Sequence, residues 1–325
     1  QNLGIELNLW EKLSMSIDLF DEHRTGILMA PRTTLAWYGV GLPSLNMGET
    51  KNHGFELDLG WHDKIDKDWR YSVNYSLSMN ENRIVFKDDP ADLERHLKEA
   101  GKPIDWQSRY LAVGNYGTID DVFNYAQTAI EQTSPQKVIP GDLVYIDYNG
   151  DGIVNLNDRV AVSQMNYPQT TMSLNLGLEY KGWGLNAMLY APLGVYKLQF
   201  DQYLWDFPDG NIKAQPNTLD RWTPEKINSN QIIRPATHLD KRQNAVQSTY
   251  SYANHSYLRL KQLEISYKFP KKLLKPLSIT ACQFYVKGNN LLTFSGVDNR
   301  IDPETGGADS YPIVRTYTVG TRITF

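Results

Sequence analysis

The chain is poor in cysteine, in long apolar runs and in net charge. Cys282 is the single cysteine in 325 residues, so the chain cannot form an internal disulfide. No stretch approaches the roughly 18–20 consecutive apolar residues that a membrane-spanning helix needs. The net charge of −4 gives no reason to expect a nucleic-acid partner. These absences exclude a disulfide-stapled fold and a helical membrane protein. They leave open a β-barrel, whose strands need only about 9–11 residues, half of them polar.

The motifs of common enzymes are also missing. The six histidines have no H-x-x-x-H spacing, and there is neither a G-x-S-x-G motif nor a glycine-rich phosphate loop. The paired carboxylates at residues 88–89 and 120–121 fall in predicted loops, where solvation explains them. We therefore expect no catalytic residues, no enzyme activity and no organic cofactor.

What the chain does contain is strict alternation of apolar and polar residues. At the C-terminal end Tyr317, Val319, Ile323 and Phe325 share one face, and mostly polar residues occupy the other. A period of two is the pattern of a half-buried β-strand. The same pattern recurs along the chain, and the predicted strands cover residues 3–9, 13–19, 55–61, 69–77, 172–180, 183–190, 263–269, 284–289 and 316–325.

Two of these segments slip out of phase. Leu258 and Leu260 are out of step with Leu263. Ile279 and Ala281 are likewise out of step with the strand that follows them. A β-bulge or a protruding strand end would explain each slip.

The lengths of the connections alternate along the chain. Tight connections at residues 11–12, 63–68, 181–182 and 270–276 take turns with long ones at about 21–52, 80–170, 192–256 and 292–313. Short turns at one end and long loops at the other are typical of outer-membrane β-barrels. The pattern predicts an all-β chain that forms nine strands of such a barrel, with the tight turns in the periplasm and the long loops outside the cell.

A soluble all-β domain with inward apolar faces is the alternative. Solvent would accept the charges on the polar faces, so those faces do not decide between the two, whereas the asymmetry of the loops favours the barrel. Nine strands are not a whole bacterial barrel, which uses an even number. Gln1 opens directly into a strand pattern, so we expect residues 1–325 to be the C-terminal part of a barrel domain whose first strands lie upstream.

Two short helices are expected in the largest loop. In residues 90–100, Leu93 and Leu97 are four positions apart, Pro90 stands at the start and Gly101 follows the end. Residues 119–130 form the second candidate. Ordered helices in a long outer loop suit a docking surface for a partner.

The sharpest local motif has the spacing of an EF-hand loop. Its ligand positions are occupied by Asp147, Asn149, Asp151, Ile153, Asn155 and Asp158. Oxygen ligands of this kind suit Ca²⁺, so the motif predicts a structural calcium ion in an outer loop. Asp158 replaces the usual glutamate at the last position, which weakens bidentate closure. The alternative is a metal-free loop held by Asx turns.

Aromatic residues are frequent in the predicted loops. Aromatic rings can stack on sugar rings, while neighbouring carboxylates bind hydroxyl groups. The richest patch lies at residues 201–211. The predicted substrate-binding residues are Trp37, Tyr38, Tyr203, Trp205, Asp206, Phe207 and Asp209. Packing between loops, or contact with a partner protein, is the alternative explanation for each ring.

Several segments resemble the C-terminal part of the SusC/RagA family of TonB-linked outer-membrane transporters. They are PGDLVYIDYNGDGIVN at residues 140–155 running on to Asp158-Arg159, NHGFEL at 52–57, LDRWTPE at 219–225, SYLRLKQL at 256–263, and GNNLLTF at 288–294 with Tyr311-Pro312. Their order and spacing span nearly the whole chain. Trp222 belongs to the third segment, which assigns it a structural role.

The resemblance implies a 22-stranded barrel with an N-terminal plug, which we expect upstream of these residues. It further implies import of oligosaccharides or peptides, energised by the TonB complex, together with a surface lipoprotein of the SusD type. A passive porin, or a surface adhesion barrel without TonB coupling, is the alternative function.

Overall fold

The computed structural model describes residues 1–33, 42–130, 138–162, 166–198, 216–226, 233–235, 243–244, 246–297, 301–305 and 311–325. Nine long strands dominate it and form one antiparallel sheet in which chain neighbours are sheet neighbours, in the order β1-β2-β3-β4-β11-β12-β15-β16-β17. Their bounds are β1 Asn2–Leu9, β2 Leu13–Met29, β3 Leu45–Lys64, β4 Trp69–Phe86, β11 Thr170–Tyr180, β12 Trp183–Leu193, β15 Tyr257–Lys268, β16 Ala281–Ser295 and β17 Thr316–Thr324. All nine predicted strands are therefore confirmed.

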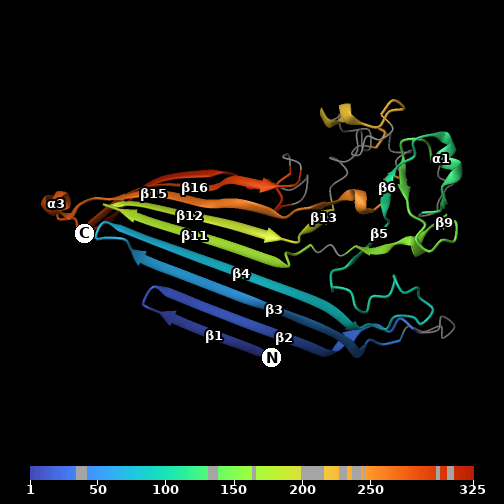
Figure 1. The fold of residues 1–325 in the computed structure, drawn as a ribbon, viewed down its shortest axis with the longest axis horizontal. Helices are drawn as coiled ribbons and strands as arrows, with labels where there is room; N and C mark the ends of the chain where they lie inside the picture. The colour runs from blue at the N-terminus through green and yellow to red at the C-terminus, as the bar shows by residue number, and fades with distance from the viewer. Residues whose placement is uncertain are drawn as a thin grey trace.

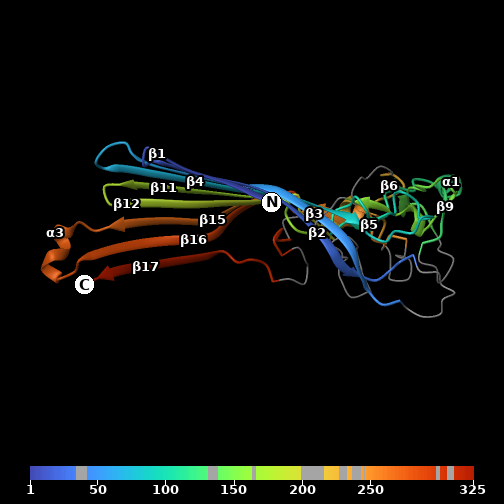
Figure 2. The same ribbon diagram turned by 90° about the horizontal axis from the view of Figure 1, so that it is seen from below.

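The sheet is open, with β1 and β17 at its two edges. Figure 2 shows it as one curved layer with no second layer packed on either side. Apolar side chains such as Leu3, Val319 and Ile323 consequently remain 59%, 65% and 48% exposed. A soluble sandwich would cover this face, so the fold agrees with the barrel prediction and not with the soluble alternative.

The connections separate into two groups, as predicted. One end of the sheet, called the turn end below, carries the short connections at residues 10–12, 65–68, 181–182 and 269–280. The opposite end, called the loop end, carries the long connections and the small strands between them (Figure 1). Trp10, Glu11 and Lys181 have positive φ angles of 55°, 53° and 45°, because tight hairpins need left-handed backbone.

Three strands extend farther toward the loop end than alternation indicated. β2 and β3 remain paired from Leu13↔Trp61 to Met29↔Leu45, and β4 follows β3 up to Glu49↔Phe86. The predicted long connections at 21–52 and 80–170 are therefore partly strand. Residues 21–25, 49–53 and 80–83 in these extensions are polar on both faces, so backbone pairing there has no period-two signal in the sequence.

One of the two phase slips is a β-bulge. Met188 pairs with Gln262 and the next residue of β12, Leu189, pairs with Leu260, so β15 contains Lys261 as an extra residue. The slip before Phe284 is not a bulge. β16 begins at Ala281 and pairs with β17 without a shift in register, whereas the Ile279 N–H bonds the Leu274 carbonyl inside the turn.

The predicted helix at residues 90–100 is wrong. This segment contains isolated turns, with hydrogen bonds from the Leu93 N–H to the Pro90 carbonyl and from the Leu97 N–H to the Glu94 carbonyl. The Asp89 carboxylate accepts from the N–H groups of residues 99 and 100, which competes with a helical pattern. The second prediction is right in part: α1 spans Ile119–Asn124 and is capped by Thr118, but Gln127–Thr128 form strand β7.

Among the described residues, no helix has the length and apolar character needed to cross a membrane.

Candidate functional site

The loop end folds into a small domain of its own, called the loop domain here. Its strands are short and pair across long stretches of sequence: β5 (Gln107–Arg109) with β10 (Val160–Val162), β6 (Ala112–Asn115) with β8 (Leu143–Tyr145), and β7 with β9 (Ile153–Val154) in parallel. Figure 1 shows these strands and α1 gathered beyond the end of the sheet. A further pair, β13 (Tyr196–Leu198) with β14 (Tyr252–Asn254), lies between this domain and the sheet.

The main buried apolar cluster of the described chain lies in the loop domain and not on the sheet. Its members come from two of the long connections, the one between β4 and β11 and the one between β12 and β15. They are Tyr110, Ile130, Leu143, Tyr145, Val154, Ile233 and Val246. The ring centroids of Tyr110 and Tyr145 are 5.7 Å apart. Burial raises the pKa of the Tyr145 hydroxyl, which donates to the carbonyl of Gln243 at 2.7 Å. The two connections are thus joined by a shared core.

A buried carboxylate organises the polar part of this core. Asp142 is completely buried, and its carboxylate accepts from Nε of Arg234 at 2.6 Å and from Nδ2 of Asn244 at 2.8 Å. The Ile139 N–H donates to the other oxygen at 3.0 Å. Burial raises the pKa of Asp142 above its ordinary value, and Arg234 acts in the opposite direction. Asp142 therefore holds three segments together, at residues 139–143, 234 and 244.

Gly141 and Trp222 form a close contact beside this carboxylate. Gly141 has φ +93°, and a Cβ placed on it would lie 2.6 Å from Cε3 of Trp222 and 2.9 Å from Cβ of Arg234. Trp222 is only 9% exposed. Its burial against the backbone of the Pro140-Gly141-Asp142 segment agrees with the structural role assigned to it from the sequence.

The EF-hand-like segment forms a loop closed by its own backbone. The Asp147 carboxylate accepts from the N–H groups of Gly150, Asp151 and Gly152 at 2.7–3.2 Å. The buried Asp158 carboxylate accepts from three more N–H groups, those of residues 148, 149 and 155, also at 2.7–3.2 Å. These are the contacts of the metal-free alternative.

Across the described residues no cluster of three or more His, Cys, Asp or Glu side chains has metal-binding geometry. The middle of the loop segment lies at the surface, where the Ile153 side chain is 45% exposed and Asp151 is exposed, whereas Val154 and Asp158 are buried. Calcium binding at residues 147–158 stays a prediction.

The predicted substrate-binding residues Trp37, Tyr38, Tyr203, Trp205, Asp206, Phe207 and Asp209 lie outside the described residues. Other loop aromatics have defined places. Tyr110 and Tyr116 are buried in the loop domain, and Trp106 is covered by the ammonium group of Lys102 at 3.8 Å. These rings therefore serve packing, which was the alternative explanation offered for loop aromatics.

A buried arginine at the loop end of β15 was missed by the sequence analysis. Arg259 is 1% exposed, and its Nη2 lies 2.8 and 2.9 Å from the two carboxylate oxygens of Asp302. Its Nη1 donates to Glu304 at 2.8 Å, and its Nε donates to Thr293 of β16 at 3.0 Å. Residues 301–305, from the connection between β16 and β17, are thereby fixed against β15.

The bulge at Lys261 determines on which face this arginine lies. Arg259 pairs with Tyr190 of β12 and Glu264 pairs with Asn186, and these two partners are four residues apart on one face. Without the extra residue, Arg259 and Glu264 would point to opposite sides. Arg259 therefore shares the polar face of the sheet, and the residues that it binds lie over that face at the loop end.

Lys197 and the buried His255 also contact residues 301–305. Nζ of Lys197 donates to the carbonyl of Glu304 at 2.7 Å, and Nδ1 of His255 lies 3.2 Å from the carbonyl of Pro303. His255 is fully buried, and its Nε2 has no hydrogen-bond partner among the described residues. Burial lowers the pKa of His255, and Lys197 adds to this effect. We call Lys197, His255, Arg259, Asp302 and Glu304 the rim cluster.

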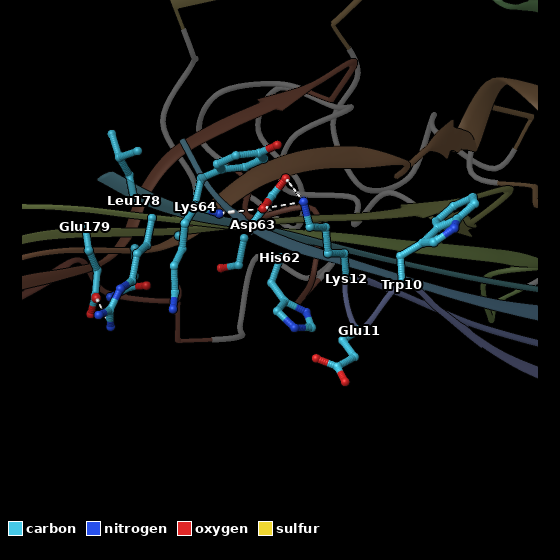
Figure 3. Close-up of a pocket in the computed structure, with 13 residues that line it drawn as sticks. Trp10, Glu11, Lys12, His62, Asp63, Lys64, Leu178 and Glu179 are labelled. Atoms are coloured by element: carbon cyan, nitrogen blue, oxygen red, sulfur yellow. Dashed lines mark hydrogen bonds and ion pairs between the residues drawn. The ribbon is translucent and has the colours of Figure 1, made fainter. Parts of the chain in front are cut away.

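The sheet also has a groove at its turn end, shown in Figure 3. It has a volume of about 510 Å³ and is bordered by the turn at residues 10–12 and by parts of β3, β4, β11 and β12. Lys12 and Asp63 form an ion pair of 2.9 Å at its edge, and Arg70 lies 3.9 Å from Glu179. Opposite charges thus alternate along this part of the sheet and neutralise each other locally.

No protein-family model matches the chain, but related proteins are found. TonB-dependent receptor P3 of Formosa agariphila is 28% identical over 350 residues, which covers 100% of this chain and 34% of that protein. TonB-dependent receptor SusC of Bacteroides thetaiotaomicron is 21% identical over 285 residues, covering 86% of this chain and 27% of SusC. The chain thus spans about a third of the length of the curated relatives that it matches.

Solved structures of a peptide transporter have a similar fold. The structure of the RagAB peptide transporter superposes with a TM-score of 0.72 at 19% identity, covering 100% of this chain and 35% of that one. The RagAB peptide importer in the open-open state superposes with a TM-score of 0.73.

An open nine-stranded sheet with short turns at one end and a folded loop domain at the other is a section of an outer-membrane β-barrel. The chain is similar over its whole length to a TonB-dependent receptor and over 86% of its length to SusC, and it has the fold of the matching part of RagAB. The resemblance drawn from the sequence motifs is thereby confirmed. The turn end accordingly faces the periplasm and the loop end faces the outside of the cell.

Proposed function

We propose that the chain forms part of an active importer, which takes oligosaccharides or peptides through the outer membrane at the expense of TonB-coupled energy. The observation that carries this proposal is the match of the whole chain to the RagAB fold, together with the names of the relatives as TonB-dependent receptors. The protein would move its cargo without changing it chemically, as a transporter and not as an enzyme.

The ordered loop domain supports the importer over a passive porin or an adhesion barrel. A porin needs a free aqueous path, whereas here two long connections pack on a common core and a third is bound to the polar face of β15. Loops fixed in this way provide a defined surface over the mouth of the barrel. Such a surface suits controlled entry of a large cargo.

The test uses the full-length transporter in a strain from which the native copy is deleted. Uptake of the cargo, found by growth on a panel of oligosaccharides and peptides, should stop when an ionophore collapses the proton-motive force. Uptake that continues at the same rate would favour the porin. No uptake of any panel member, combined with firm cell-surface binding, would favour the adhesion barrel.

For the partner, we propose a SusD-like lipoprotein that docks on the outer side of the loop domain. α1 presents Ile119 and Phe123 at 54% and 80% exposure, and Val113 of β6 is 58% exposed. Figure 1 shows α1 at the part of the loop domain farthest from the sheet. Exposed apolar side chains gathered on an ordered element are typical of a protein interface.

A pair of variants tests this surface. Phe123→Asp should strongly reduce co-purification of the lipoprotein with the transporter, because it places a charge at the centre of the contact. Leu219→Asp is the matched control, since Leu219 is 76% exposed on a different element, the 3₁₀ turn Pro216–Asp220. Equal co-purification of both variants with the wild type would place the partner elsewhere.

A further inference from the structure

The turn between β15 and β16 differs from the other turns at its end of the sheet. It contains helix α3 (Lys271–Leu274) and the 3₁₀ turn η6 (Lys275–Leu277), and it projects beyond the neighbouring hairpins (Figure 1). We call residues 269–280 the basic foot, because Lys271, Lys272 and Lys275 are its charged residues and it has no Asp or Glu. The turn at 10–12 has one acid and one lysine, and the turn at 65–68 has two acids and one lysine.

The lysines of the basic foot are available to an external partner. All three side chains are exposed. In the described part of the chain, none of them has a carboxylate within 4.0 Å, whereas Lys12, Lys181 and Lys268 at the same end are each paired with an acidic residue. The positive charge of the foot is therefore not neutralised by the protein itself.

The basic foot begins where an aromatic band ends. Trp69 stacks on Tyr180 with ring centroids 4.2 Å apart, and Trp183 contacts Tyr267 at 5.0 Å. Phe269, the first residue of the foot, contacts Tyr267 at 5.2 Å. These rings lie on the apolar face, at the turn ends of consecutive strands. Such a girdle marks the depth at which the hydrocarbon core gives way to lipid headgroups.

The position of the basic foot beside the aromatic band determines which part of the membrane surrounds it. Residues that directly follow the girdle on the turn side lie among headgroups, where lysine amines find phosphate groups and their aliphatic stems remain near the apolar boundary. Leu273 is 64% exposed between the lysines, while the next residue, Leu274, is buried and anchors the helix. An exposed leucine flanked by three unneutralised lysines suits a lipid surface better than open solvent.

We propose that the basic foot binds the phosphate groups of anionic phospholipids in the periplasmic leaflet, through Lys271, Lys272 and Lys275. This surface is distinct from the route of the cargo and from the docking surface on α1. It fixes the barrel vertically on the side of β15 and β16, because the headgroups hold the foot at their own depth. The inference rests only on the barrel crossing the outer membrane, and not on the proposed import.

The test uses the full-length transporter in detergent, titrated with phosphatidylglycerol or with phosphatidylcholine and followed by native mass spectrometry. The wild type should retain phosphatidylglycerol in preference. Each lysine near an anionic headgroup contributes roughly fivefold in affinity, so K271Q/K272Q/K275Q should weaken binding roughly a hundredfold. K271R/K272R/K275R keeps the charges and should keep the affinity.

The matched control is K98Q/K226Q, which removes lysines from the loop side and should leave lipid binding unchanged. The inference is overturned if the glutamine variant binds phosphatidylglycerol as tightly as the wild type, or if the wild type does not distinguish the two lipids. It is also overturned if inorganic phosphate displaces the lipid at equal concentration, since that outcome indicates an isolated anion site. If the wild type imports its cargo but fails these tests, lipid binding by the basic foot is refuted and the proposed import is not.

Discussion

Arg259 of β15 and Asp302 of the β16–β17 connection form a two-bond ion pair, with Nη2 of the arginine 2.8 and 2.9 Å from the two carboxylate oxygens. The arginine is almost fully buried, and its Nη1 donates a hydrogen bond to the Glu304 carboxylate. The pair joins a strand of the barrel wall to a loop that is more than forty residues away in sequence. Arg259 thus fixes that loop over the polar face together with Lys197 and His255, which contact the same segment.

Arg259→Gln should release residues 301–305 from the sheet. Removing one partner from a buried ion pair costs about 3–5 kcal/mol, because the Asp302 carboxylate, whose side chain is 13% exposed, stays largely buried without its counter-charge. Hydrogen exchange of the amides at 301–305 measures the release as a loss of protection. Lys261→Gln is the control, since Lys261 lies 3.9 Å from Glu304 with both side chains more than a third exposed, and such pairs contribute about 0–1 kcal/mol. Unchanged protection in Arg259→Gln would contradict the role given to the pair.

Gly141→Ala should destabilise the loop domain by about 2 kcal/mol or more. Backbone at φ +93° strains any residue with a Cβ, and here the new Cβ would also collide with Trp222 at 2.6 Å. Gly150→Ala separates the two causes, because Gly150 has φ +76° and nothing within 4 Å of its Cβ position. Near-ultraviolet circular dichroism on heating should show a larger shift for Gly141→Ala than for Gly150→Ala. Equal shifts would mean that the contact with Trp222 contributes nothing.

The rim cluster should weaken in mild acid through His255. Burial lowers the pKa of this imidazole, so the folded cluster binds fewer protons than the unfolded one below the ordinary value of about 6.5. The stabilising contribution is therefore complete above that value and is lost as the pH falls from it toward and through the lowered pKa of the folded state. The protection factors of the amides at residues 301–305, corrected for the intrinsic exchange rate at each pH, should fall across this range in the wild type.

His255→Gln should remove this pH dependence while keeping a group that can donate to the Pro303 carbonyl. His62→Gln, at the opposite end of the sheet, should retain the dependence of the wild type. A variant lacking His255 that still loses protection at the same pH would assign the effect to another group.

The loop at residues 147–158 should bind Ca²⁺ if the EF-hand spacing is functional. Calorimetric titration at millimolar Ca²⁺ should then show heat of binding that is lost in Asp151→Ala, because Asp151 occupies a ligand position of the motif. Asp120→Ala, a carboxylate of α1 outside the motif, should bind as the wild type does. An absence of binding heat in all three proteins would establish the metal-free loop, which is already closed by the Asp147 and Asp158 carboxylates.

The sheet could be predicted from the sequence because alternation reports directly on a surface with one apolar and one polar face. The phase slip between Leu260 and Leu263 indicated a β-bulge or a protruding strand end, and the structure contains a bulge there, at Lys261. The outer parts of β2, β3 and β4 escaped prediction, since strands outside an apolar environment need no alternation. The helix expected at 90–100 failed because the Asp89 carboxylate binds the N–H groups of residues 99 and 100 and competes with the helix.

The rim cluster and the buried Asp142 could not be found in this way. In the sequence Arg259 is a polar residue of a predicted strand. No neighbouring residue indicates that its Nη2 atom lies within 3 Å of the Asp302 carboxylate. Asp142 meets Arg234 and Asn244 across about a hundred residues. Contacts of this range leave no local periodicity. Arg259 and Asp142 both lie inside the motifs that resemble one family, but a motif does not show which distant residues its side chains contact.

The main apolar core of the described chain lies in the loop domain, while the sheet keeps its apolar face uncovered by protein. The two parts are consequently stabilised by different surroundings. The stability of the sheet depends on the detergent or lipid that covers its apolar face. The stability of the loop domain depends on the hydrophobic effect in its buried core. Cooperative all-or-none unfolding is not expected of such a combination, so calorimetry should resolve two transitions. The transition of the sheet should move with the length of the lipid chains, and that of the loop domain should respond to substitutions at Asp142 and Gly141.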